Sequence, residues 1–185
     1  GGMGMAATVL AGTQAAMLAL MSVVPVHIHE EGGGDAVMAA ILGAHLASMY
    51  GLAPLLGAYI DRYGHRAGLG AGALLCVTGA LLSAVTEVPV VAALGLVGLG
   101  SGWCSAYLGA TAAAGATAAP RERASVLGMV DMSASVTAAT AGVLTGLVVG
   151  VVGVVALTLA VASAMTLLVL VTCRPRPAAP EPRSA

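Results

Sequence analysis

Apolar residues run along this chain in six long stretches, which short polar segments separate. A helix needs about 20 mostly apolar residues to cross the hydrocarbon core of a bilayer, and each stretch reaches that length. The predicted membrane spans are residues 5–26, 36–60, 67–86, 88–112, 124–149 and 151–173. The pattern therefore predicts an all-α membrane protein, with six transmembrane helices in residues 1–173.

The polar segments mark the predicted turns with different clarity. Residues 27–35 and 61–66 carry several charges, and residues 86–89 and 120–123 combine charge with proline. The fifth turn, near Gly150 and Gly153, has no charge, but the apolar run around it is too long for one crossing. Residues 174–185 are rich in proline and arginine, so we expect a tail that is not helical.

Composition supports a lipid environment. Hydrophobic residues make up 59% of the chain and charged residues 8%, whereas soluble domains carry roughly 25% charged residues. Mean hydropathy is +1.00. The net charge of −1 and the absence of a basic patch argue against a nucleic-acid partner.

Small residues recur at four-residue spacing on two of the predicted spans. Gly142, Gly146 and Gly150 share one helix face, and so do Gly43, Ala47 and Gly51. Small side chains let helix backbones approach closely in lipid. We therefore expect both faces to be close-packing seams within the bundle, with a homodimer contact as the alternative.

Charge placement predicts the orientation in the membrane. The seven basic residues all fall on one side of a six-span arrangement, and they are Arg62, Arg66, Arg121, Arg123, Arg174, Arg176 and Arg183. The acidic residues Glu30, Glu31, Asp35 and Glu87 fall on the other side. Because basic loops stay in the cytoplasm, we expect both termini of this segment to be cytoplasmic. The Ala, Gly and Arg bias without any Lys favours a bacterial source, and hence an inner (plasma) membrane.

The loop between the second and third spans has a distinctive spacing. Gly57 is followed after three residues by Asp61 and Arg62, and then by Gly64 and Arg66. This resembles the loop between the second and third helices of a major facilitator superfamily half, although His65 stands where that family has a basic residue. The resemblance implies a transporter that works by alternating access, in which this loop latches the cytoplasmic gate.

Other features favour the C-terminal half of such a transporter. The fourth span lacks an intramembrane arginine, the fifth lacks a Gly-Pro pair, and the tail resembles a natural C-terminus. The resemblance implies a partner, either a missing N-terminal six-helix half or a second copy, because the substrate path lies between two halves. It also implies small-molecule substrates and, at family level, proton-coupled efflux by an antiporter.

Several residues could belong to the cytoplasmic gate or to a path for protons or substrate. Arg62 and Arg66 could form charge-assisted hydrogen bonds with Glu122 or Asp131. Asp131 lies within a span, where a carboxylate is costly and needs a partner or a cavity; pairing with an arginine is favoured over proton or cation binding. His45 and Gln14 could line a proton or substrate path, but a hydrogen bond to a neighbouring helix explains each of them better.

Other classes of function fit less well. An intramembrane serine protease would need a Gly-x-Ser-Gly nucleophile and a later histidine, but Leu99 breaks that pattern at Ser101 and no histidine follows His65. We therefore expect no enzyme and no cofactor. His27, His29, Glu30 and Glu31 are better explained as a solvated loop than as a metal site. A six-helix membrane scaffold or binding protein that does not transport remains the alternative.

Overall fold

The computed structural model describes residues 2–30, 32, 34–85 and 88–172. Its elements are all helices, namely α1 (Gly2–Glu30), α2 (Asp35–Gly51), α3 (Ala53–Tyr63), α4 (His65–Ser83), α5 (Pro89–Thr117), α6 (Arg123–Val152) and α7 (Val154–Thr172). Among the described residues, five helical segments are long and apolar enough to cross a membrane, with α2 and α3 counted as one. The last helix adds a shorter apolar segment, Val154–Leu170. The chain is thus an all-α membrane half bundle.

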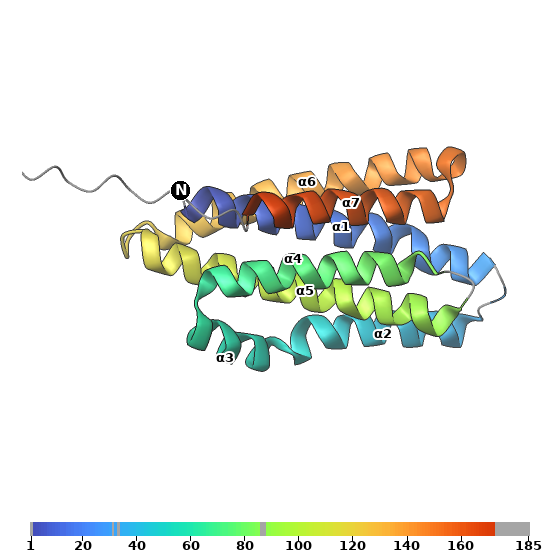
Figure 1. Cartoon of the computed structure of the whole chain (residues 1–185), viewed down its shortest axis with the longest axis horizontal. Helices are drawn as coiled ribbons and strands as arrows, with labels where there is room; N and C mark the ends of the chain where they lie inside the picture. The colour runs from blue at the N-terminus through green and yellow to red at the C-terminus, as the bar shows by residue number, and fades with distance from the viewer. Residues whose placement is uncertain (1, 31, 33, 86–87, 173–185) are drawn as a thin grey trace, which may run out of the picture.

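The helices lie side by side along one long axis (Figure 1). The start of α1, the α3–α4 turn and the α5–α6 turn lie at one end. We call this the arginine end, because Arg62, Arg66, Arg121 and Arg123 belong to it. The chain passes from α1 to α2, from α4 to α5 and from α6 to α7 at the opposite end.

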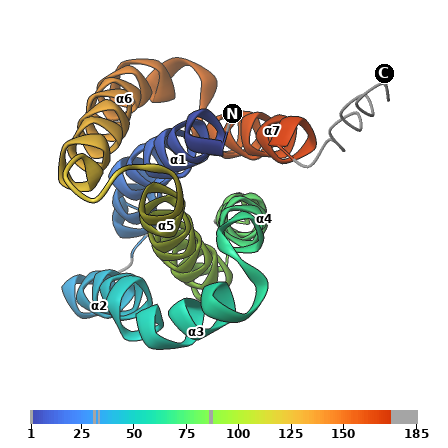
Figure 2. The same ribbon diagram turned by 90° about the vertical axis from the view of Figure 1, so that its left-hand side faces the viewer.

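Helix α5 lies at the centre of the bundle (Figure 2). It packs most extensively on α4 and also contacts α1, α2 and α3. Helix α6 packs mainly on α1, and α7 packs mainly on α4 and then α1. Helices α2 and α6 flank one side of the bundle without contacting each other.

The α4–α5 contact is a seam of glycines. A Cβ atom added at Gly72 would lie 2.7 Å from the backbone of both Ala106 and Gly102, and one at Gly79 would lie 2.6 Å from the Gly95 carbonyl. The Ser105 hydroxyl donates a hydrogen bond of 2.8 Å to the Gly68 carbonyl across the same contact. Close backbone approach of this kind is how helices associate in lipid, where no hydrophobic force drives them together.

The close-packing seams predicted on the second and fifth spans are wrong for the described chain. A Cβ atom at Gly43, Gly51, Gly146 or Gly150 would meet no other atom nearby, and Gly142 would only touch the Leu18 side chain at 3.5 Å. Four-residue spacing identifies a helix face that permits close approach. It does not show whether another helix packs against that face. The tight contacts formed instead between α4 and α5, which are adjacent in sequence.

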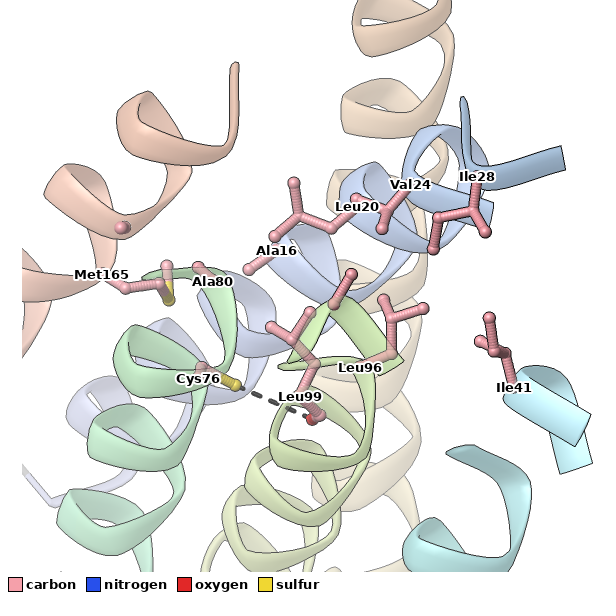
Figure 3. Close-up of a cluster of buried hydrophobic side chains, with 12 residues drawn as sticks. Ala16, Leu20, Val24, Ile28, Ile41, Cys76, Ala80, Leu96, Leu99 and Met165 are labelled. Carbon is pink, nitrogen blue, oxygen red and sulfur yellow. Dashed lines mark hydrogen bonds between the residues drawn. The ribbon is translucent and has the colours of Figure 1, made fainter. Parts of the chain in front are cut away.

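Apolar side chains fill the space between α1, α4, α5 and α7 (Figure 3). Leu20 and Val24 of α1 and Leu96 and Leu99 of α5 are all fully buried there. Cys76 of α4 points toward the Leu99 carbonyl, with its sulfur 3.9 Å from that oxygen. This cluster joins α1 to the α4–α5 pair.

The second predicted span is interrupted at Leu52, between α2 and α3. Pro54 follows in the first turn of α3, where its missing N–H costs no hydrogen bond. Ile60 is the only buried residue of α3. Its side chain occupies the space that a Cβ atom would take at Gly68 of α4. Ile60 is therefore the buried side chain that joins α3 to α4, while α3 also contacts α5.

We expect a Gly72→Val substitution to destabilise the half bundle, because the valine side chain would push α4 away from the α5 backbone. Overpacking of this kind costs about 1–3 kcal/mol. Gly70→Val is the matched control, since a Cβ atom there meets nothing nearby. The measurement is the apparent melting temperature of each purified variant in detergent. Equal melting temperatures would contradict the role of the seam.

We expect Ile60→Ala to loosen α3 without unfolding the bundle. Backbone amides of residues 53–63 should exchange with deuterium at least about tenfold faster, because removing a buried isoleucine side chain costs about 2–5 kcal/mol and 1.4 kcal/mol is already tenfold. Leu55→Ala in the same helix is the control, since Leu55 is 70% exposed. Equal exchange in the two variants would show that α3 is held by other contacts.

Candidate functional site

The predicted gating loop lies at the arginine end, between α3 and α4. Asp61 and Arg62 are exposed in the last turn of α3. Gly64 ends that helix with a φ of 88°, and its N–H donates a hydrogen bond of 2.7 Å to the Ile60 carbonyl. Arg66 is exposed in the first turn of α4. The glycine is required at this turn, because other residues rarely adopt a positive φ.

Tyrosine rings accompany the charges of this loop. Tyr59 and Tyr63 lie one turn apart on α3, with ring centroids 4.9 Å apart. The guanidinium carbon of Arg62 lies 5.5 Å from the centre of the Tyr63 ring, within the range of a cation–π contact. In the described part of the chain, neither Arg62 nor Arg66 forms an ion pair. Their pairing with an acidic residue of α6 stays a prediction.

The two acidic candidates for that pairing lie at different depths. Glu122 is exposed at the start of α6, at the arginine end. Asp131 is partly buried, and it lies eight residues beyond Arg123, roughly 12 Å farther along the helix axis. Glu122 is therefore at the level of the loop, whereas Asp131 lies well inside the span.

Gln14 lies in the middle of α1 and connects three helices. Its amide nitrogen donates a hydrogen bond of 3.2 Å to the Ser135 hydroxyl of α6. Its amide oxygen accepts one of 3.4 Å from the indole nitrogen of Trp103 on α5. Since an unpaired carboxamide is costly in an apolar environment, these bonds explain how Gln14 is accommodated there.

Two further aromatic rings contact Trp103, the partner of this amide. Trp103 stacks on Tyr107 of the same helix, with ring centroids 5.2 Å apart and an interplanar angle of 27°. Tyr50 of α2 meets Trp103 edge to face at 6.5 Å. We call Gln14, Tyr50, Trp103, Tyr107 and Ser135 the aromatic–amide cluster.

The cluster belongs to one side of the bundle. Its residues come from α1, α2, α5 and α6 only, and these helices form the side that faces away from α4 and α7 (Figure 2). Tyr50 is 65% exposed, and α2 and α6 do not contact each other across this side. The polar and aromatic side chains are thus placed where the half bundle is open.

His45 ties α2 to α5 near the opposite end. Its Nδ1 atom lies 2.7 Å from the Leu96 carbonyl. Because a carbonyl only accepts, Nδ1 is the donor in this bond. The Ser48 hydroxyl reaches the neighbouring Val97 carbonyl at 3.1 Å. His45 is buried, so within the described chain it joins helices rather than lining the open side.

A separate cavity of about 310 Å³ lies between α1, α6 and α7. Thr145 is the only polar side chain in its lining, which otherwise consists of alanine, glycine, leucine, valine and methionine. Sites for small molecules combine apolar walls with a few placed polar groups that orient the ligand. This cavity has almost no polar groups, so the aromatic–amide cluster is the stronger candidate of the two.

Sequence reasoning identified Gln14 but missed its aromatic neighbours. A usable signal was present, because the chain has one tryptophan, four tyrosines and no phenylalanine. Such scarce rings are informative wherever they occur. What the sequence did not reveal is that residues 50, 103 and 107 meet, since that depends on how α2 packs against α5.

Comparisons with known proteins agree with the geometry. The sequence model of the Major Facilitator Superfamily matches residues 4–185. The chain is similar to the uncharacterized MFS-type transporter YddS of Bacillus subtilis (strain 168), with 33% identity over 139 residues, which cover 74% of this chain and 32% of that protein. It is also similar to the uncharacterized MFS-type transporter YdeG of the same organism, with 30% identity over 145 residues, 77% of this chain and 34% of that protein.

The chain thus matches about a third of the length of these two relatives. The family match covers nearly all of it, and its helices are those of a multi-pass membrane protein. The chain belongs to the Major Facilitator Superfamily of membrane transporters.

Proposed function

We propose that this chain forms one six-helix half of a secondary transporter, which moves small organic solutes across a bacterial inner membrane by alternating access. The observation that carries the proposal is the aromatic–amide cluster on the open side of the bundle. Polar groups inside a membrane protein are costly and mark paths for solutes or ions. The cluster also joins α1, α5 and α6 by hydrogen bonds, so its placement on the open side is what favours transport over a scaffold.

The proposed partner is an N-terminal six-helix half or a second copy of this chain. In this family two halves are related by an axis along the membrane normal, and solutes bind near the midplane between them. The chain matches about a third of each relative's length, as part of a larger transporter would. The open side between α2 and α6 would face that partner.

The proposed orientation places the arginine end in the cytoplasm. All four described arginines lie there, and arginines accumulate on the cytoplasmic side of membrane proteins. Both termini of this segment would then be cytoplasmic, in keeping with six crossings.

The loop formed by Gly57, Asp61, Arg62, Gly64 and Arg66 is the proposed cytoplasmic latch. Its charges are exposed, so they are available for pairing when the gate closes. Glu122 is the better partner for an arginine of this loop, because it lies at the same end of the bundle. The equilibrium between gate states needs only a modest bias, of about 1–3 kcal/mol.

We also propose that the solute moves out of the cell and that the proton gradient drives this movement. Asp131 is a carboxylate well inside a described span, where a change of protonation would alter the cost of exposing it to lipid. His45 is less suited to proton transfer, because its Nδ1 already bonds the Leu96 carbonyl.

We expect Asp61→Asn to lower transport at least about tenfold in the full-length polypeptide, with membrane insertion unchanged. The substitution removes a charge from the latch. A change of about 1.4 kcal/mol in the free-energy difference between the gate states corresponds to a tenfold change in their equilibrium. Transport is measured as uptake into everted membrane vesicles energised by a proton gradient. Asp35→Asn, at the opposite end, is the control. Unchanged transport in the Asp61 variant would refute the latch.

We expect Asp131→Asn to abolish the dependence of transport on the proton gradient, because the amide cannot exchange a proton. The measurement is the ratio of solute flux with and without an imposed pH difference, in liposomes containing the full-length polypeptide. The ratio should fall to about one. A wild-type ratio would place proton coupling elsewhere in the transporter.

A further inference from the structure

We infer that the aromatic–amide cluster and Asp131 select aromatic organic cations as the transported solute. This inference rests on the proposed transport function, and it adds the chemical class of the solute. It follows from where the chain places its few aromatic rings, its amide and its intramembrane carboxylate.

The first observation is that aromatic rings and the amide lie together in one place. Three of the chain's aromatic rings meet at Trp103, where Tyr50 and Tyr107 contact its ring. The Trp103 indole in turn bonds Gln14, the only carboxamide in the sequence. The remaining tyrosines, Tyr59 and Tyr63, lie in α3 at the arginine end. Among the described residues, the buried members of the two apolar clusters include no aromatic ring.

Depth along the helices is the second observation. Helices α5 and α6 are antiparallel and meet at the arginine end. Tyr107 lies one turn from Trp103 toward that end, and Asp131 lies one turn from Ser135 in the same direction. Residues four apart also share a helix face. Since Gln14 bonds both Trp103 and Ser135, the Asp131 carboxylate and the Tyr107 ring lie at a similar depth.

Charge is the third observation. Asp131 is the only charged residue on these helices near the level of the cluster, and Arg123 lies roughly 12 Å away along α6. Aromatic faces attract cations, more strongly where water is excluded. A carboxylate and several aromatic faces therefore favour a cation over an anion of the same size and shape.

Gln14 has a positioning role in this arrangement. It accepts the hydrogen bond of the indole N–H, which restrains the orientation of the Trp103 ring. Tyr107 stacks nearly parallel to that ring, so a flat aromatic group would extend an existing stack. The cationic centre would then be held by Asp131.

The test uses the full-length polypeptide in lipid nanodiscs and two probes of the same shape with opposite charge, tetraphenylphosphonium and tetraphenylborate. Binding is measured by equilibrium dialysis, after subtraction of the partitioning into protein-free nanodiscs. We expect tetraphenylphosphonium to bind at least about tenfold more tightly than tetraphenylborate. Equal binding of the two ions would overturn the inference.

Variants locate the binding to this side of the bundle. Trp103→Leu and Asp131→Asn should each weaken tetraphenylphosphonium binding at least about tenfold, whereas Trp103→Phe and Asp131→Glu should retain most of it. Tyr59→Leu, which removes a ring outside the cluster, should bind as the wild type does. If Trp103→Leu and Asp131→Asn are folded and bind normally, the cluster serves packing alone and the inference fails.

Flux measurements in energised vesicles, set beside the binding data, separate this inference from the proposed function. Cation binding without any flux of tetraphenylphosphonium into energised vesicles would refute transport but leave the site standing. Flux of neutral or anionic solutes, with no preference for the phosphonium ion, would leave transport standing and refute the cation site.

Discussion

The close approach of α4 to α5 is the constraint on which the bundle depends. Lipid tails are as apolar as leucine, so burying apolar side chains does not by itself bring two membrane helices together. Glycines at 72, 79, 95 and 102 remove the Cβ atoms that would separate the backbones, and many dispersion contacts then become available. With α5 fixed in this way, α1, α2 and α3 can each pack on its remaining surface.

That central pairing also determines where polar groups can go. The side of α5 that faces α4 is filled by backbone contacts, so its larger side chains, Trp103 and Tyr107, point toward the other helices. There they meet Gln14 and Tyr50. The small residues on the α4-facing side of α5 are thus accompanied by large aromatic side chains on the side that faces α1 and α2.

The sequence predicted the helical membrane fold and the family, because both follow from local patterns. Long apolar runs predict helices of sufficient length, and the Gly57 to Arg66 spacing identifies the family's loop. The tight seam was predicted on the wrong helices, since glycine spacing alone does not name a partner. The aromatic–amide cluster could not be predicted, because it depends on which helices meet.

The break between α2 and α3 relates the two proposed functional regions. Tyr50 of the cluster lies just before Leu52, and the gating loop follows α3. Ile60 is the only buried residue of α3. A helix that is continuous through this point would move Tyr50 and Asp61 together. A break lets α3 change its tilt while α2 stays bonded to α5 through His45 and Ser48. In the proposed mechanism, this would let the gate open without dismantling the solute site.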